Sequence, residues 1–230
     1  MGGEDAEIDR FLPMSKSLLK VIALDFDGTL VESNHIKDNA FKTIFSAWPD
    51  HLDTMMEWHL SHNTIDRREK FRYFVEEILK QVGEKILIKE LSDKFSILTR
   101  KAIIECPLVN GVQEFLDDCI GKVPLFMVSA SPQDELEIIL KERQLEGYFQ
   151  GTYGAPIDKY KVLKKIMTSK NVSKNEILYI GDSPEDQKAA LMLGIQFISR
   201  KSDRQLNDFG DIYLDFAEIK EHILQRYEFR

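Results

Sequence analysis

The chain has 230 residues, of which 43% are hydrophobic and 30% are charged, a balance typical of soluble globular proteins and not of disordered, fibrous or membrane-embedded ones. This length allows one large domain, or one domain that carries a smaller insertion. The formal net charge of -8 argues against a nucleic-acid partner, because an acidic surface repels a phosphate backbone.

Neither export nor membrane insertion is expected. The N-terminal stretch MGGEDAEIDR is acidic, whereas a secretory signal begins with basic residues. The apolar runs are far shorter than the roughly 20 residues that cross a bilayer. Two cysteines, Cys106 and Cys119, are too few for a disulfide framework or a zinc site, which favours a reducing compartment. We therefore expect a cytoplasmic protein without a membrane partner.

Residues 1–19 are predicted to form an N-terminal extension, and the first strand is expected at residues 20–24, KVIAL. Its branched apolar residues end abruptly at Asp25, as in a strand that is buried on both faces. Similar apolar runs, separated by helix-length segments, recur at residues 123–128, 177–180, 195–198 and, more weakly, 212–214. Strands that alternate with helices predict an α/β fold with a central parallel sheet.

The segment after the first strand follows a helical pattern without a convincing strand. Its apolar residues recur at helical spacing, at Phe41, Ile44, Phe45, Phe71, Phe74, Val75, Ile78 and Leu79. We therefore expect a helical insertion over residues 33–105, within a core made of residues 20–32 and 106–230. The chain is expected to end in an amphipathic helix with one apolar face, formed by Phe216, Ile219, Ile223 and Tyr227.

Four polar groups fall where a parallel sheet binds its ligands, outside the carboxyl ends of the strands. They are DFDGTL, which begins at Asp25, SAS, which begins at Ser129, a predicted helix start at Asp158 and Lys159, and GDSPED, which begins at Gly181. Together they predict one polar crevice.

The two carboxylates of the first group can divide the work of phosphoryl transfer. Asp25 and Asp27 face the same crevice if the chain turns after the strand, and Gly28 permits that turn. Asp25 is placed to attack phosphorus and form an aspartyl phosphate, while Asp27 protonates the leaving oxygen and later accepts a proton from water. Asp182 can complete with Asp25 an all-oxygen site that favours Mg²⁺. A lone pair of this kind is as often a helix cap or a turn.

A cation and two hydroxyls extend this predicted site. Lys159 supplies positive charge that holds the nucleophile and neutralises the transferring phosphoryl group. Ser129 and Thr29 can donate hydroxyl hydrogen bonds to phosphoryl oxygens. Taken singly, residues of these types more often lie in turns or on solvated surface, so the inference depends on the whole set.

The ordered set DFDGTL, VSAS, DKYKVL and YIGDSPED resembles the haloacid dehalogenase-like (HAD) hydrolase superfamily over nearly the whole of residues 20–198. The resemblance implies a Rossmann-like three-layer core with a central parallel sheet and a helical cap inserted after the first strand. It makes Asp25 the nucleophile and Asp27 the general acid and base. Haloacid dehalogenases proper lack an acid at the second position, because halide leaves without protonation, so Asp27 points to phosphoryl chemistry. The helical insertion looks like the cap of the superfamily, and together they indicate its capped phosphatase branch.

The resemblance also assigns the remaining roles. Ser129, with Ala130 beside it, binds phosphate, and Lys159 is the stabilising lysine. Lys161 is a competing candidate for the lysine, although Lys159 fits the family's spacing to the first core leucine better.

The same resemblance makes Asp182 a Mg²⁺ ligand that Asp186 assists, and the backbone carbonyl of Asp27 the other protein ligand. The stretches NHIKDNAF, HLSHNTIDRREKF and SASPQDEL with YGAPIDK look like those of capped phosphatases often linked with sugar or nucleotide-sugar metabolism.

Basic residues gather in one part of the expected cap. Arg67 or Lys70 can meet an anionic substrate group such as a carboxylate, although a solvated helix face with charge pairs explains them equally well. His59 and His62 lack a nearby acidic or cysteine partner at the spacing of a metal site, and the sequence leaves open whether they contact substrate.

The expected function is that of a Mg²⁺-dependent phosphatase. It hydrolyses a small phosphorylated metabolite, a sugar phosphate or a phosphorylated organic acid, through an aspartyl phosphate on Asp25. One alternative is a phosphomutase of the β-phosphoglucomutase type. Another is a non-catalytic phospho-sensing module, which the 70-residue insertion disfavours because a receiver domain has no use for a cap. The protein is expected to be a monomer or a homodimer.

Overall fold

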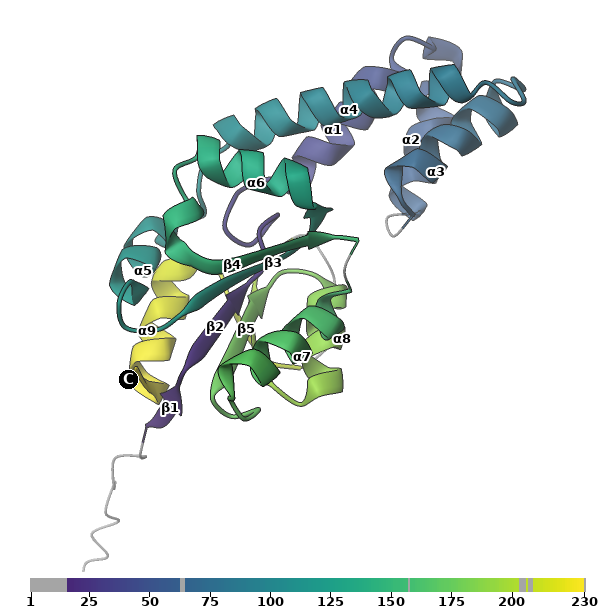
Figure 1. The fold of residues 1–230 in the computed structure, drawn as a ribbon. Helices are drawn as coiled ribbons and strands as arrows, with labels where there is room; N and C mark the ends of the chain where they lie inside the picture. The colour runs from purple at the N-terminus through teal and green to yellow at the C-terminus, as the bar shows by residue number, and fades with distance from the viewer. Residues whose placement is uncertain (1–15, 63–64, 157, 203–205, 207–208, 230) are drawn as a thin grey trace, which may run out of the picture.

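The computed structural model describes residues 16–229 apart from 63–64, 157, 203–205 and 207–208. These residues form a three-layer α/β fold around a parallel sheet, as the sequence predicted, with a group of helices above one end of the sheet (Figure 1). Most of the extension expected at residues 1–19 lies outside the described residues.

Six parallel strands form the central sheet in the order β4-β3-β2-β5-β6-β7. The five strands that the sequence predicted are all present in this sheet, as β2 Val21–Leu24, β3 Leu125–Pro132, β5 Ile177–Gly181, β6 Gln196–Arg200 and β7 Asp211–Tyr213. The ends of β3 differ from the prediction, because its pairing with β4 resumes at Pro132 after a register shift. The SAS motif therefore lies inside the carboxyl-terminal half of β3 and not after it.

Strand β4, Phe149–Ala155, is a sheet member that the sequence analysis missed. It lies at the edge of the sheet, and Gly154 is its only buried residue, so it has no apolar run to indicate a strand. A side chain at Gly154 would come within 2.7 Å of the Ser131 carbonyl oxygen. Gly154, which interrupts any apolar pattern in this segment, thus allows β4 to approach β3 closely.

Two further short strands join the ends of the described chain. Strand β1, Ser17–Leu19, pairs in parallel with β8, Tyr227–Phe229. It lies within the residues expected to form an extension, yet Leu19 is completely buried. Tyr227, expected on the last helix, belongs to β8 because that helix ends at Arg226. Three residues are too few to show a periodicity.

Helices cover both faces of the sheet. On one face lie α5 Val112–Cys119, α6 Gln133–Glu142 and α9 Phe216–Arg226, and on the other lie α7 Lys159–Lys170 and α8 Pro184–Leu193. The short helix η3, Glu146–Tyr148, leads into β4. Each face of the sheet buries its own apolar cluster, which explains the continuously apolar strands.

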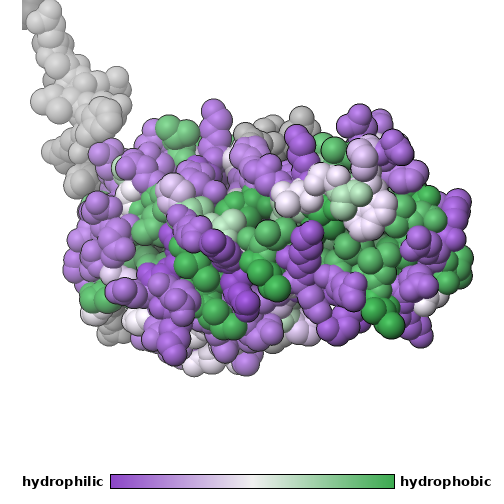
Figure 2. Space-filling view, turned by 90° about the horizontal axis from the view of Figure 1, so that it is seen from above, coloured by the Kyte–Doolittle hydropathy of each residue, from purple (hydrophilic) through white to green (hydrophobic). Residues whose placement is uncertain are grey.

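The helical group between β2 and α5 has a separate core. Its elements are α1 Asn34–Phe45, η1 Pro49–His51, α2 Leu52–Ser61, α3 Arg67–Tyr73, the π-helical η2 Phe74–Ile78 and α4 Lys85–Glu105. Aromatic side chains dominate this core: the ring centroids of Phe41 and Phe95 are 4.5 Å apart, and Phe41 also contacts Phe71. The face seen from the side of α4 mixes hydrophobic and hydrophilic side chains (Figure 2). Within the described part of the chain, every helix is too short or too polar to cross a bilayer.

Candidate active site

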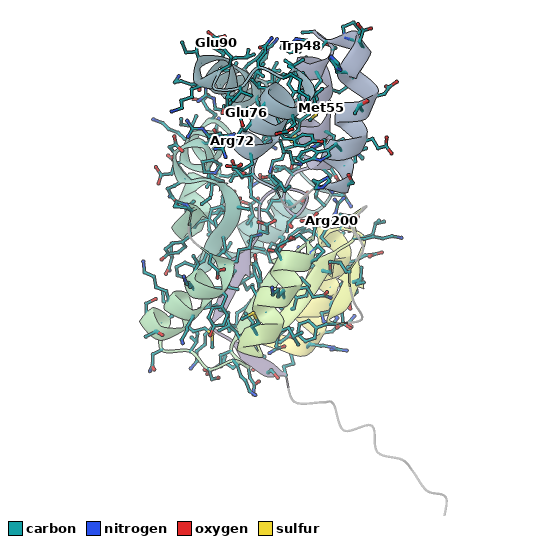
Figure 3. The ribbon with its side chains drawn as sticks, turned by 90° about the vertical axis from the view of Figure 1, so that its right-hand side faces the viewer. Trp48, Met55, Arg72, Glu76, Glu90 and Arg200 are labelled. Atoms are coloured by element: carbon teal, nitrogen blue, oxygen red, sulfur yellow. The ribbon has the colours of Figure 1, made fainter. Side chains whose placement is uncertain are left out.

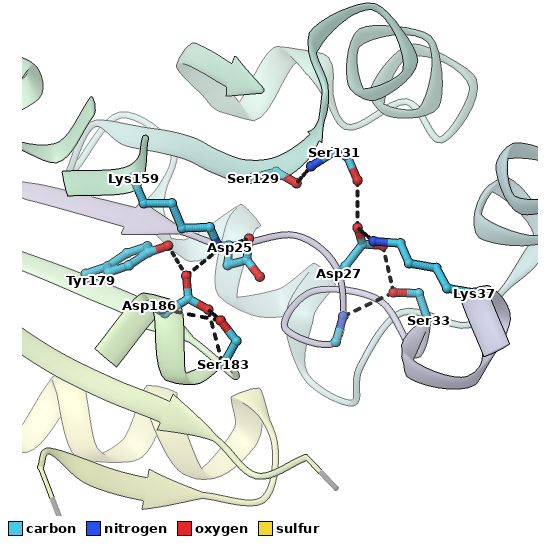
Figure 4. A network of polar contacts seen from close by, with 11 residues as sticks. Asp25, Asp27, Ser33, Lys37, Ser129, Ser131, Lys159, Tyr179, Ser183 and Asp186 are labelled. Carbon is cyan, nitrogen blue, oxygen red and sulfur yellow. Dashed lines mark hydrogen bonds and ion pairs between the residues drawn. The ribbon is translucent and has the colours of Figure 1, made fainter. Parts of the chain in front are cut away.

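The predicted catalytic residues converge at the carboxyl end of the sheet, below the helical group. Asp25 directly follows β2, Asp182 directly follows β5, and Lys159 is the first residue of α7. Figure 4 shows the side chains of Asp25, Lys159 and Asp186 turned toward one another. The convergence follows from the topology, because the ends of β2 and β5 are neighbours in the sheet.

Lys159 joins two of the carboxylates. Its Nζ donates to Asp25 Oδ1 at 2.9 Å and to Asp186 Oδ1 at 2.5 Å. The side chain of Asp158 caps α7 by accepting from the backbone N–H of Lys161, and Lys161 itself is exposed. Of the two candidate lysines, the structure brings Lys159 to Asp25.

Asp186 is held on both of its oxygens. Oδ1 accepts from Lys159 and from the hydroxyl of Tyr179, and Oδ2 accepts from the backbone N–H of Ser183 at 3.1 Å and from its hydroxyl at 2.6 Å. Burial raises the pKa of Asp186, but Lys159 and these hydrogen bonds outweigh burial and hold it below its usual range. Asp186 thereby fixes Lys159. Tyr179 was missed by the sequence analysis, because it lies within an otherwise aliphatic strand and reads as a core residue.

Three buried carboxylates form a cluster that fits a divalent cation. One oxygen from each of Asp25, Asp182 and Asp186 lies within 4.8 Å of the others. Burial, followed by the charge of Asp186, raises the pKa of Asp25 to about 8, and Lys159 opposes this only in part. Hard carboxylate oxygens are the donors that Mg²⁺ prefers. Such an ion, when bound, would neutralise the cluster and polarise a phosphoryl oxygen.

Asp27 points away from this cluster. Its carboxylate accepts hydrogen bonds from Ser131 at 2.7 Å, Ser33 at 2.8 Å and Lys37 at 3.0 Å (Figure 4). Burial raises the pKa of Asp27, but Lys37 and the hydrogen bonds more than compensate and lower it below its usual 3.8. In this arrangement Asp27 is ionised and able to accept a proton. Ser131 belongs to the SAS group expected in the crevice, whereas Ser33 and Lys37 were missed, although Lys37 lies inside the stretch NHIKDNAF.

The turn between Asp25 and the helical group requires the glycine that the sequence singled out. Gly28 has a φ of +74°, and a Cβ there would lie 2.4 Å from Asp182 Oδ2. Arg200, at the end of β6, donates to the Gly28 carbonyl at 3.1 Å and to Glu32 at 2.6 Å. It lies close to the boundary between the core and the helical group (Figure 3). The sequence carried no signal for this buried arginine.

The predicted phosphate-binding residues differ in their accessibility. Ser129 is buried, and its hydroxyl oxygen accepts from the backbone N–H of Ser131 at 3.1 Å. Ala130 beside it is exposed. Thr29 is completely buried, and its hydroxyl has no hydrogen-bond partner in the described part of the chain. Because Thr29 is completely buried, a phosphoryl oxygen would reach its hydroxyl only if the loop that follows β2 moved.

The basic residues of the helical group have internal partners. Arg67 binds Glu135 of α6. Lys70 is buried, and its ammonium contacts His59 Nδ1 at 2.8 Å, while His59 Nε2 contacts Asp38 at 2.9 Å. Burial lowers the pKa of Lys70 to about 8, and Asp38 offsets this only partly.

The other candidate histidine, His62, stacks on the indole of Trp58 with ring centroids 4.3 Å apart.

The fold and this geometry define a class of protein: α/β proteins that present a strand-end aspartate, a carboxylate cluster and a lysine at one edge of a parallel sheet. The family model for haloacid dehalogenase-like hydrolases matches residues 22–199. The chain therefore belongs to the haloacid dehalogenase-like hydrolase family.

Solved structures share the whole architecture at low sequence identity. A predicted phosphoglycolate phosphatase from Haemophilus somnus superposes with a TM-score of 0.69 at 19% identity, over 89% of this chain and 97% of its own. YfnB from Bacillus subtilis, bound to magnesium, has a TM-score of 0.68 at 14% identity, over 90% and 99%. CbbY from Rhodobacter sphaeroides, in complex with phosphate, has a TM-score of 0.66 at 15% identity, over 88% and 96%. At these identities the likeness establishes the fold alone. No curated protein matches the sequence.

Proposed function

We propose that this protein is a Mg²⁺-dependent phosphatase that hydrolyses a small phosphorylated metabolite through an aspartyl phosphate on Asp25. The observation that carries the proposal is the bridge of Lys159 between Asp25 and Asp186, beside the buried carboxylate of Asp182. Phosphate-monoester hydrolysis needs one of the largest known rate accelerations. A nucleophile, a cation and a divalent-metal site at one place fit that demand.

In the first proposed step, an oxygen of Asp25 attacks phosphorus while the bond to the leaving alkoxide breaks. Lys159 holds Asp25 Oδ1, which leaves the other carboxylate oxygen to form the new bond. The alkoxide takes a proton from Asp27, which receives that proton from solvent when the negative charge of the substrate's phosphoryl group enters the site. In the second step Asp27 accepts a proton from water, whose oxygen attacks the phosphorus of the aspartyl phosphate and releases Asp25 with inorganic phosphate.

The other residues bind and enclose the substrate. We assign phosphate binding to the hydroxyl of Ser129 and the backbone beside Ala130, and Mg²⁺ binding to Asp25, Asp182 and the carbonyl of Asp27, with Asp186 holding Lys159. Residues 33–105 form a cap over a core of residues 20–32 and 106–230. The cap excludes water from the site when it closes. The magnesium in YfnB and the phosphate in CbbY are consistent with such a site on this fold.

The test is phosphate release from a panel of phosphorylated metabolites and an aryl phosphate, with and without Mg²⁺. We expect Asp25→Asn to abolish turnover without lowering the melting temperature, because Asn keeps the shape of a carboxyl group whose charge is disfavoured by burial. Asp53→Asn, at an exposed position in the cap, serves as the matched control. Full turnover by Asp25→Asn, or release that is independent of Mg²⁺, would reject the proposal.

Product analysis separates hydrolysis from the mutase alternative. Free inorganic phosphate from a hexose phosphate supports a phosphatase, whereas an isomerised sugar phosphate supports a phosphomutase, in which Asp25 returns the phosphoryl group to another hydroxyl.

A further inference from the structure

A charge pair links the cap to the core at the edge of the site. Arg67, the first residue of α3, faces Glu135 in the first turn of α6. Arg67 Nη2 donates to Glu135 Oε1 at 2.8 Å, and Nη1 donates to Oε2 at 3.4 Å. The two side chains are 26% and 16% exposed. This two-pronged geometry matches guanidinium to carboxylate, and it is the same geometry by which arginine recognises a carboxylate or phosphate on a ligand.

Glu135 is close in sequence to the residues expected to hold the substrate. Glu135 follows the strand that carries Ser129 and Ser131 by only a few residues, and the Ser131 hydroxyl contacts Asp27. On the cap side, Arg67 lies 5.7 Å from the ring of Phe95. The pair thus joins the cap to the first turn of the helix that directly follows the strand carrying Ser129.

The other cations around the site also have partners. Lys159 is bound by Asp25 and Asp186, and Lys37 is bound by Asp27. Lys70 is 3% exposed and contacts His59 inside the cap. Among the described residues, Arg67, Lys37 and Lys159 could therefore meet a second anionic group of a substrate only if that group displaced a carboxylate of the protein.

We propose that Glu135 is a specificity-determining residue that occupies Arg67, so that the site favours phosphate monoesters whose remaining part is uncharged, such as polyol or sugar phosphates. This inference rests on the proposed phosphatase function. Monoesters that also carry a carboxylate or a second phosphate are disfavoured for two reasons. They meet the negative charge of Glu135, and they gain Arg67 only by breaking its existing pair.

The test uses two compounds that differ at one carbon. Glycerol 3-phosphate ends in an uncharged hydroxymethyl group, and 3-phosphoglycerate ends in a carboxylate at the same position. Each compound is measured as a competitive inhibitor of p-nitrophenyl phosphate hydrolysis in Mg²⁺. The comparison is therefore valid whether or not the enzyme hydrolyses the compound itself. The ratio of the two inhibition constants reports the preference.

We expect the wild-type protein to bind glycerol 3-phosphate more tightly. Glu135→Gln, which leaves Arg67 unpaired, should shift the ratio toward 3-phosphoglycerate by about fivefold, the size expected for one partly exposed charge pair. Arg67→Gln, which leaves Glu135 unpaired, should shift the ratio in the opposite direction. Glu142→Gln, at an exposed position of the same helix, removes an equal charge and should leave the ratio unchanged.

The opposite directions distinguish specificity from a mere structural latch. If the pair only held the cap closed, both variants would weaken the two compounds alike and the ratio would not move. That result, a shift in the same direction for both variants, or a wild-type preference for 3-phosphoglycerate would overturn the inference. Failure of the proposed function is a separate outcome, visible as a lack of Mg²⁺-dependent p-nitrophenyl phosphate hydrolysis by the wild-type protein.

Discussion

The core and the cap bury charge in different ways. At the carboxyl end of the sheet, the carboxylates of Asp25, Asp182 and Asp186 are clustered, and the ammonium of Lys159 pairs with Asp25 and Asp186. In the cap, the single ammonium of Lys70 lies among aromatic rings with the imidazole of His59 as its contact. The core cluster carries excess negative charge, whereas the cap buries one base that can release its proton.

This difference is the one expected between a ligand-binding site, in the core domain, and a packed interior, in the cap. Buried like charges are costly without a counterion, so the core arrangement is understandable as a place prepared for a cation and a phosphoryl group. The cap has no comparable excess, because a lysine whose pKa has fallen to about 8 is easily neutralised. Buried charge in the core therefore supports the proposed chemistry, and buried charge in the cap is consistent with packing around a polar contact.

Replacing the core lysine should have the largest effect. Lys159→Met removes the cation that holds Asp25, and we expect kcat at saturating Mg²⁺ to fall by about 10²- to 10³-fold, as for loss of one preorganised electrostatic group. The measurement is initial-rate phosphate release. Lys161→Met, two residues away and exposed, should retain wild-type activity. Equal losses in the two variants would show that the position of Lys159 is not what matters.

Replacing the cap lysine should alter stability and its pH dependence. Lys70 has a folded-state pKa of about 8 against 10.5 for an ordinary lysine, so between these values the unfolded chain binds more protons and stability rises with pH. We expect Lys70→Met to lack this rise and to be more stable than the wild type by about 1 to 4 kcal/mol at pH 7, because it no longer buries the charge. Urea unfolding at pH 7 and pH 10 measures both effects.

An exposed cap lysine provides the control for that experiment. Lys101→Met on α4 should follow the wild-type pH dependence. If Lys70→Met retains the wild-type rise in stability, the ammonium is not buried as charge, and the contrast with the core is lost.

Removing the contact between Lys37 of the cap and Asp27 of the core should have the smallest effect on stability. Lys37→Met removes the cap residue that contacts Asp27, and we expect a loss of about 1 kcal/mol at pH 7, as for a partly exposed ion pair. Because the folded-state pKa of Asp27 lies below 3.8, this stabilisation is present above about pH 4 and disappears as the pH falls further. Unfolding measured from pH 7 to pH 3 follows the change.

Lys42→Met, exposed on the same helix α1, is the matched variant. A difference between Lys37→Met and the wild type that does not decrease at all between pH 7 and pH 3 would mean that Lys37 stabilises the protein by packing and not by its contact with Asp27.

Local patterns accounted for most of the fold and for the gathering of the candidate residues at one end of the sheet. Asp25 and Asp182 directly follow buried strands, and apolar runs with strand ends are visible in any window of the sequence. The predicted helical insertion follows from the spacing of residues such as Phe41 and Phe71. The edge strand β4 was not predicted, because Gly154 is its only buried residue and its strand conformation depends on pairing with β3.

Contacts between distant residues account for what the sequence analysis missed. Ser131 and Asp27 are 104 positions apart, and Arg67 and Glu135 are 68 apart. Nothing at either position indicates its partner. For the same reason, the sequence left Arg67 and Lys70 as equivalent cations, although one lies at the cap–core boundary and the other is buried.

By itself, the sequence determined that a parallel sheet presents an aspartate, a lysine and further carboxylates at the carboxyl end of its strands. Strand ends and turns are set by residues close together in the chain. Only the tertiary structure decided which charges are paired, since pairing depends on which elements pack together. Lys159 contacts Asp25 because α7 packs against β3 and shares an apolar cluster with β2, and Arg67 meets Glu135 because α4 of the cap packs against α6. Whether each charged side chain is paired, and with which partner, therefore depends on the assembled fold.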